Sequence, residues 1–156
     1  MSNNFTYRLP AEDAFVLKLP VDSTTVIEVG DLCYWDTDDV KNAAAISDQG
    51  TEAQNKAYFS ARFIGVSLDS HASGDTNDVR IARVGQFEYS LDTATGQAYA
   101  EFTEIEVGAD TTDCDDQIVE IGSTSPIGRL VKRAASGDTK VTIEIYCIKN
   151  PFVTAA

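Results

Sequence analysis

The residues best suited to chemistry in this chain are one histidine and two clusters of aspartates. His71 is the only histidine, and an imidazole can serve as the general base of a Ser–His–Asp triad. It precedes the segment Ala72-Ser73-Gly74-Asp75-Thr76, which recurs at residues 135–139, where Ala134 stands in the place of His71. Because the second copy does without an imidazole, we predict a structural role for His71, no catalytic residues and no enzymatic activity.

Two acidic segments raise the question of Ca²⁺, a hard cation that takes about six to eight oxygen ligands. One contains Asp36, Asp38 and Asp39, and the other contains Asp110, Asp113, Asp115 and Asp116. Neither matches the helix–loop–helix pattern of a dedicated calcium loop. We therefore predict solvated loops with no bound metal and no cofactor, and calcium binding by these loops stays an open alternative.

Thiol chemistry and nucleotide binding have little support. The three cysteines (Cys33, Cys114 and Cys147) are an odd number without CxxC spacing. Cys33 and Cys147 lie in apolar runs, where a thiol packs as a small hydrophobic side chain, and a reducing cytosol keeps thiols free. The sequence contains neither a GxxxxGK[ST] phosphate loop nor a GxGxxG motif. We expect three free, structural thiols.

Length and charge limit the classes of function. A chain of 156 residues fits one domain, or two very small ones that share a core. Its 25 acidic and 12 basic residues give a net charge of −13, which repels phosphate backbones and argues against direct nucleic-acid binding. No apolar run approaches the roughly 20 residues of a membrane span, and no secretory signal is visible at the first residues. We expect neither nucleic acid nor membrane as a partner.

The chain carries an internal repeat. Ile64-Gly65 precedes the first Ala-Ser-Gly-Asp-Thr by six residues, and Ile127-Gly128 precedes the second by six. Val-x-Ile follows each copy, and upstream the Ile-Glu-Val-Gly of residues 27–30 matches that of residues 105–108. Chance does not readily reproduce both order and spacing, so we interpret residues of about 27–84 and 105–146 as two copies of one supersecondary unit.

Each copy reads as a strand, a tight loop and a returning strand. Residues 63–68 and 126–131 have strand composition, and residues 79–84 and 140–146 alternate apolar with polar side chains. In the loops, Gly supplies positive φ and Asp bonds nearby amides. The predicted turn residues are Gly30, Asp31, Gly65, Gly74, Asp75, Gly128, Gly137 and Asp138.

The remaining segments complete a mainly β protein. One short helix is expected from about Thr51 to Arg62, capped by Thr51 or Asp48, with an inward face made by Ala53, Ala57 and Phe59 or Tyr58. Further strands are expected at residues 87–91, 98–102 and 117–121. Many short strands separated by Gly/Asp/Ser turns indicate a small β-barrel or β-tulip-like fold, or a sandwich, with a duplicated strand–turn–strand unit.

The first residues are expected to stand apart from this domain. Residues 1–22 contain Pro10 and Pro20 and alternate loosely, which fits an edge strand or an extended arm because Pro cannot donate to a central ladder. We assign 1–22 to an extended N-terminal arm and 23–156 to a single β domain. Possible interface residues on the arm are Phe5, Tyr7, Leu9, Phe15, Leu17 and Leu19.

The order IEVGDLCYWD, a short Ala- and Gln-containing helix, FIGVSLD, ASGDTNDVRIA and VGQFEYSL resembles the capsid decoration (cement) proteins of tailed phages. The resemblance covers Val29 to Leu91 and returns from Ile105 to Tyr146. It implies a small β-rich structural protein, made in the host cytoplasm, that sits on the outer capsid surface of the virion. It also implies binding to the major capsid protein of the head and self-association as a homotrimer at three-fold positions between capsomers.

Three other readings remain open. One reading is another virion module, of a tail or spike, that binds glycans or a bacterial surface. The chain can also be read as a small β-barrel hydrolase or lyase that uses the aspartate clusters and a metal, or as a secreted Ca²⁺-binding β-module. The hydrolase or lyase reading requires a reactive constellation, and reactive side chains are scarce in this sequence.

Overall fold

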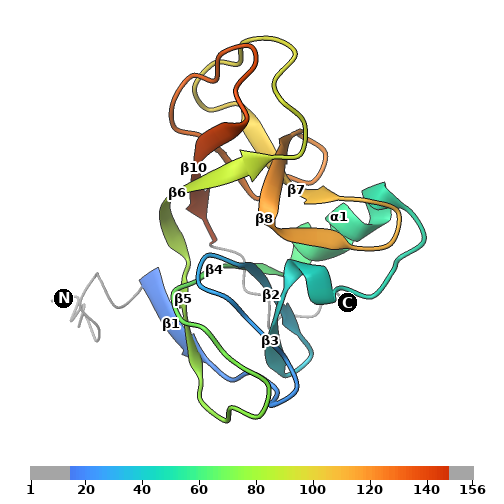
Figure 1. Ribbon diagram of the computed structural model, residues 1–156, viewed down its shortest axis with the longest axis vertical. Helices are drawn as coiled ribbons and strands as arrows, with labels where there is room; N and C mark the ends of the chain where they lie inside the picture. Colours follow the sequence, from blue (N-terminus) through green and yellow to red (C-terminus); the bar gives the residue numbers. More distant parts are fainter. Residues whose placement is uncertain (1–14, 148–156) are drawn as a thin grey trace, which may run out of the picture.

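The computed structural model describes residues 15–147, which form two lobes of five strands each (Figure 1). Lobe 1 contains β1 (Val16–Leu19), β2 (Leu32–Asp36), β3 (Asp39–Asn42), β4 (Phe63–Ser67) and β5 (Val79–Ala82). Lobe 2 contains β6 (Val84–Leu91), β7 (Glu104–Ala109), β8 (Cys114–Ile121), β9 (Gly128–Leu130) and β10 (Lys140–Tyr146). One α-helix, α1 (Glu52–Arg62), and a 3-10 turn (Ala43–Ala45) connect β3 to β4. The predicted mainly β class with one short helix is confirmed.

The two lobes have the same strand order. Lobe 1 is a sheet of order β1-β5-β4-β2-β3, and lobe 2 is a closed barrel of order β6-β10-β9-β7-β8. The ring of lobe 2 closes because β6 pairs in parallel with β8, with Ser90 opposite Ile118 and Leu91 opposite Val119. β1 therefore corresponds to β6, β2 to β7, and so on to β5 and β10.

The register of the strands repeats as well. Cys33 lies opposite Gly65 in the β2–β4 pair, and Ile105 lies opposite Gly128 in the β7–β9 pair. In the same way Ser67 faces Ile81 across β4 and β5, and Leu130 faces Ile143 across β9 and β10. The repeat is thus structural, and it is longer than the sequence indicates, since its two copies begin at β1 and β6.

The upstream part of the sequence alignment is wrong. Ile27 forms an isolated bridge with His71, and Tyr99 forms the equivalent bridge with Ala134. Three residues later, Gly30 donates to the Ser67 carbonyl and Phe102 to the Leu130 carbonyl, each at 2.8 Å. Residues 27–31 therefore correspond to 99–103, whereas residues 105–108 lie in β7. The strand predicted at 98–102 is a bridge and a turn instead.

The two Ser-Gly-Asp turns have the same geometry. Gly74 has φ +95° and Gly137 has φ +92°, a region that favours glycine. In each turn the Asp carboxylate accepts the amide of the Ala three residues earlier, at 2.9 Å in the first copy and 2.7 Å in the second. The Gly amide donates to the carbonyl of Ser23 or Thr95, at 2.7 and 2.8 Å. Each loop is held by its own aspartate and by the chain beside it.

Gly65 and Gly128, which the sequence assigns to turns, lie inside strands. A Cβ at Gly65 would stand 2.1 Å from the Ala82 carbonyl oxygen, and one at Gly128 would stand 2.5 Å from that of Glu144. Real side chains do not approach a backbone oxygen so closely, so β5 and β10 can pack against these positions only because glycine has no side chain. The Ile-Gly pair is therefore a close-approach signal of the β4–β5 and β9–β10 pairs.

Two hydrophobic clusters share the strands of lobe 1. A small cluster fills the inside of lobe 1 and includes Cys33, Ile64 and Ile81, with Leu19 packed against it. A larger cluster contains Leu32 and Tyr34 together with the inward residues of lobe 2. Because alternate residues of β2 point to opposite faces, this strand serves both clusters, and the lobes are joined by a continuous apolar contact.

Helix α1 belongs to the first repeat but packs on the second. Thr51 caps it by accepting the Gln54 amide at 3.2 Å, in agreement with one of the two predicted caps. Its buried residues are Asn55, Lys56, Phe59 and Ser60, while Ala53 and Ala57 are exposed. The predicted alanine face is wrong because the helix turns polar groups toward lobe 2, whereas the predicted burial of Phe59 is confirmed. There Asn55 donates to the Asp110 carbonyl at 3.2 Å and Ser60 to the Pro126 carbonyl at 3.1 Å.

The N-terminal segment enters the fold earlier than the sequence suggests. β1 pairs antiparallel with β5, the Pro20 carbonyl accepts the Val40 amide at 2.9 Å, and Val21 is buried. Residues 16–22 therefore belong to lobe 1, which moves the boundary of any arm to the N-terminal side of Val16. Among residues 15–147 no helix is long and apolar enough to span a membrane.

Candidate functional site

His71 has a structural environment. It is 1% exposed and its Nδ1 lies 2.7 Å from the Thr25 carbonyl oxygen, while Nε2 has no hydrogen-bond partner. Its main chain forms both hydrogen bonds of the bridge to Ile27, at 2.9 Å each. A side chain enclosed in this way does not reach a substrate, and the equivalent Ala134 is buried in the same bridge of lobe 2.

Cys33 and Cys114 are buried free thiols, as predicted, and Cys147 is buried as well. Burial, together with the negative charges of the neighbouring Asp113 and Asp115, raises the pKa of Cys114 to about 12. Burial likewise raises the pKa of Cys33 well above its ordinary value. Because the thiolate is the reactive form of cysteine, the raised pKa keeps these two thiols protonated and unreactive.

The second acidic segment is used internally. The Asp110 carboxylate accepts the amides of Thr112 and Asp113, at 2.7 and 3.1 Å, and these bonds lower its pKa. Asp116 accepts the Asn42 side-chain amide at 3.1 Å, which links lobe 2 to β3 of lobe 1. Over the described part of the chain, no three His, Cys, Asp or Glu side chains converge as a metal site would require.

Asp31 ties the two lobes together. Its side chain is 1% exposed and accepts three hydrogen bonds. The donors are the Glu28 amide at 2.8 Å, the Asn42 side chain at 3.3 Å and the Gln117 side chain of β8 at 2.8 Å. Gly30, the preceding residue, has φ +96° and its carbonyl accepts the Tyr89 hydroxyl at 2.6 Å. These two predicted turn residues form the polar junction between the lobes.

A second group of buried charges fixes helix α1. The Lys56 ammonium lies 2.6 Å from Glu52 and 3.7 Å from Glu106, and it also contacts Glu120. Glu106 accepts the amides of Thr124 and Ser125, at 2.6 and 2.7 Å. Each carboxylate therefore has donors, and the group holds the helix against β7 and β8.

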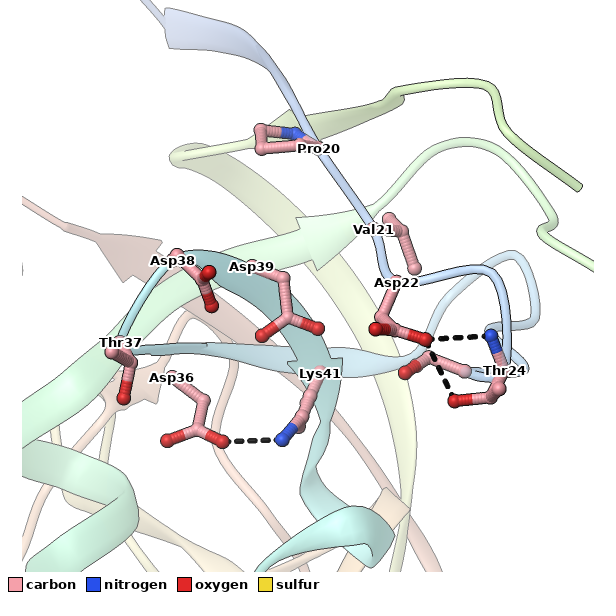
Figure 2. Close-up of a pocket in the computed structure, with 10 residues that line it drawn as sticks. Pro20, Val21, Asp22, Thr24, Asp36, Thr37, Asp38, Asp39 and Lys41 are labelled. Carbon is pink, nitrogen blue, oxygen red and sulfur yellow. Dashed lines mark hydrogen bonds and ion pairs between the residues drawn. The ribbon is translucent and has the colours of Figure 1, made fainter.

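The first acidic segment lines a pocket of about 580 Å³, called here the acidic pocket. It lies between the segment that follows β1, which contributes Asp22, and the β2–β3 hairpin, which contributes Asp36, Asp38, Asp39 and Lys41. Figure 2 shows the carboxylates of Asp22, Asp36 and Asp39 gathered around the Lys41 side chain. The sequence identifies three of these aspartates, whereas the fold adds Asp22 from a distant segment.

The carboxylates of the acidic pocket differ in their surroundings. Asp36 bonds Lys41 and thereby raises the pKa of the lysine. Asp22 accepts the amide and hydroxyl of Thr24, at 2.8 and 2.7 Å, and these bonds lower its pKa. Burial raises the pKa of Asp39, which is 9% exposed and whose Oδ2 has no hydrogen-bond partner. The pocket is therefore polar and electronegative, with one carboxylate incompletely satisfied.

An exposed aromatic face lies on lobe 2 and consists of Phe102, Arg129 and Tyr146. Phe102 is 66% exposed and Tyr146 is 59% exposed. Both line a hollow of about 680 Å³ together with Arg129, whose guanidinium carbon lies 5.9 Å from the centre of the Phe102 ring. Large exposed aromatic side chains and Arg are the residue types enriched at protein–protein contacts.

The backbone at Phe102 is unusual. It has φ +66°, while its counterpart Gly30 in lobe 1 has φ +96°. A bulky residue in this left-handed region is strained by about 1–2 kcal/mol. The ring is not used for packing, since it is largely exposed. Strain combined with exposure is expected of a residue that serves a contact. The sequence does not reveal this feature, because its repeat aligns residues 27–30 with 105–108 and so does not match Phe102 to Gly30.

The predicted arm residues are divided by the structure. Phe5, Tyr7 and Leu9 lie outside the described residues. Phe15 is 42% exposed, whereas Leu17 and Leu19 are partly buried in β1, with Leu19 against the core of lobe 1. Of the possible interface residues that can be placed, Phe15 is thus the one that presents a large apolar surface to solvent.

No family model and no curated protein matches this chain.

Proposed function

We propose that this protein is a structural virion component that binds the outside of a phage capsid and stabilises the shell. In this role it acts as a trimer at three-fold positions between capsomers, and its partner is the major capsid protein. The proposal starts from the resemblance of the sequence to decoration proteins. The structural support is the aromatic face on a rigid β lobe, because such a function requires adhesion instead of catalysis.

Phe102 is the observation that carries the proposal. It combines a positive φ with 66% exposure at a position where the other lobe has glycine. Folding alone would be served better by glycine at this position. A binding contact accounts for the exposed aromatic ring, since aromatic side chains contribute large contact area at the centre of protein interfaces.

The physics of attachment favours a small adhesive protein. A protein that binds only the assembled shell stabilises that state by mass action. Linking contacts in a trimer raises overall affinity by about 10²–10⁴ over a single contact when the geometry allows simultaneous engagement. The net charge of −13 disfavours unspecific self-association, so the shell surface that it contacts is expected to be less acidic than the protein.

Co-sedimentation with capsids of the encoding phage, prepared without this protein, tests the proposal. We expect the wild-type protein to pellet with the shells and to raise their melting temperature. Phe102→Gly should weaken binding at least tenfold while the isolated protein unfolds at the same or a slightly higher temperature. The control Val26→Ser removes a side chain of lobe 1 that is 53% exposed, and it should bind as wild type.

Two results would contradict the proposal. Wild-type protein that stays in the supernatant of the shells rejects a decoration role, and equal binding by Phe102→Gly rejects the aromatic face as the contact. Electron cryomicroscopy of the decorated shells then tests the trimer, because density away from the three-fold positions would exclude that arrangement.

The expected N-terminal arm is tested by a deletion that spares β1, because loss of β1 would damage lobe 1. Removal of residues 2–14 leaves the described strands intact, and it should lower shell occupancy if the arm adds a strand to a neighbouring sheet edge. Unchanged occupancy would exclude the arm from attachment.

A further inference from the structure

The acidic pocket occupies the place where lobe 1 departs from the closed barrel of lobe 2. In lobe 2 the corresponding strands, β6 and β8, pair and close the ring. In lobe 1 the chain after β1 bonds β3 through the Pro20 carbonyl and the Val40 amide. Beyond this bond the Asp22 backbone amide bonds the Asp39 carboxylate, and the pocket lies beside these residues. The seam that two paired strands close in lobe 2 is therefore bridged in lobe 1 by an acidic side chain that borders the pocket.

The charge in the pocket is unbalanced. Four aspartates and one lysine are among its lining residues, and the lysine is paired with Asp36. Among residues 15–147, no ion pair involves Asp22, Asp38 or Asp39. Carboxylates that face one space without cations repel one another, so this space attracts a positive group.

A second observation does not depend on the number of acidic residues. Asp39 is 9% exposed and lines the pocket, but its Oδ2 has no hydrogen-bond partner. A buried carboxylate oxygen normally has a donor, and leaving it without one is costly. An incoming cation that bears N–H donors would compensate the charge of Asp39.

The geometry favours a guanidinium over a metal ion. No three acidic side chains of the described residues converge closely enough to coordinate a cation directly. A guanidinium carries five N–H donors in a planar fork and can bridge carboxylates that lie farther apart. We propose that the acidic pocket binds an arginine side chain presented by an extended segment of a partner protein, between Asp22 on one side and Asp38 and Asp39 on the other.

This proposal is separate from attachment to a capsid, and its test uses a peptide alone. The probe is acetyl-Gly-Arg-Gly-Arg-Gly-amide, titrated into the ¹⁵N-labelled full chain at low salt. The matched control peptide carries citrulline, which keeps the shape of arginine but lacks the charge. We expect saturable amide shifts confined to residues 21–25 and 36–41, with a millimolar Kd, and no shifts with the citrulline peptide.

Variants of the chain make the test specific. Asp38→Asn and Asp39→Asn should each weaken peptide binding about tenfold, because each removes a charge-assisted partner of the guanidinium. Asp78→Asn removes an exposed carboxylate outside the pocket lining and should bind as wild type. Asp38 is exposed, so its variant keeps the test valid if Asp39→Asn perturbs folding.

Four outcomes would overturn the proposal. Shifts spread over the acidic surface would indicate unspecific attraction. The same conclusion would follow if Asp38→Asn and Asp39→Asn both bound the peptide as tightly as the wild type. Equal shifts with the citrulline peptide would exclude recognition of the charge. If calcium chloride shifted the same amides with a lower Kd than the peptide, the pocket would be assigned to an inorganic cation. Because no capsid is involved, none of these results bears on the decoration role.

Discussion

Lobe 1 and lobe 2 contain the same five strands in the same order and register, but they have been specialised differently. In lobe 2 the β6–β8 pair closes the ring, whereas in lobe 1 the equivalent seam borders the acidic pocket. Lobe 2 instead carries the aromatic face, at a position where lobe 1 has Gly30. A duplicated frame thus leaves each copy free to change at its loops and edges while the shared pairing is kept.

The connection between the third and fourth strands shows the same division. In lobe 1 it contains helix α1, and in lobe 2 it is reduced to residues 122–127. The helix of the first copy covers β7 and β8 of the second, with Lys56 buried among three glutamates. The lobes therefore differ most in the connections between their strands and least in the strands themselves.

The largest expected effect lies at Gly65, and its counterpart Gly128 gives the matched comparison. Gly65→Ala places a Cβ 2.1 Å from a backbone oxygen at φ +138° and should cost about 3–4 kcal/mol. Gly128→Ala meets its neighbour at 2.5 Å without a positive φ and should cost about 2 kcal/mol. Urea unfolding measures both.

Gly74→Ala and Gly137→Ala are the matched controls for these two variants. No atom lies within 4 Å of a Cβ at either position, so only the φ strain of about 1 kcal/mol remains. Equal costs at all four glycines would refute the distinction between close approach and turn geometry, and unequal costs at the two turns would refute their equivalence.

An intermediate effect is expected at the link between the lobes. Lys56→Met removes the cation from two carboxylates that are largely buried, since the side chains of Glu106 and Glu120 are 6% and 21% exposed. Leaving such charges unpaired should cost about 3 kcal/mol in the free energy of unfolding. The control Lys140→Met breaks a pair with Glu88 at 3.8 Å in which both side chains are about two-thirds exposed. Its cost should be about 0.5 kcal/mol or less.

Addition of Glu106→Gln to Lys56→Met should recover part of the lost stability, because it removes one of the unpaired charges. A Lys56→Met variant as stable as the wild type would show that the helix is held by its apolar contacts alone.

The smallest effect concerns the response of lobe 1 to acid. Arg80 bonds the Asp69 carboxylate at 2.7 Å and, with its backbone amide, lowers the pKa of Asp69 to about 2. A folded-state pKa below the unfolded value of about 4 contributes stability above pH 4, which is lost as the pH falls toward 2. The equivalent residues of lobe 2, Lys132 and Thr142, cannot form this pair.

Denaturant unfolding of the wild type and Asp69→Asn between pH 6 and pH 2 measures this contribution. The wild type should be slightly more stable at pH 6, and the difference should vanish near pH 2. A difference that grows on acidification would contradict the assignment. High salt should reduce it, because the side chains of this pair are 57% and 32% exposed.

The sequence predicts the parts of this fold that depend on local chemistry. The Ser-Gly-Asp turns could be anticipated because glycine supplies the φ and aspartate the acceptor within five residues. The alternation of residues 79–84 and 140–146 predicts strands, and Thr51 predicts the start of the helix. These features are encoded over short distances, where composition and spacing are sufficient.

What the sequence does not predict depends on distant partners. The similarity of residues 27–30 and 105–108 was misleading, since the structural partner of Gly30 is Phe102, which shares no chemistry with it. The inward face of α1 is set by Glu106 and Glu120 on lobe 2, so Lys56 is buried while Ala53 is exposed. The acidic pocket required Asp22, which the fold brings to the β2–β3 hairpin.

The position of the helix bears on the history of the chain. An ancestral gene with a single repeat would encode a helix that packs Phe59 on Tyr34 of its own lobe but leaves Lys56 without the Glu106 and Glu120 carboxylates of a second lobe. Two such products could satisfy one another only by exchanging helices as a pair. Fusion of the two genes would make that exchange permanent and would render one of the two helices dispensable, and in this chain the second repeat lacks it.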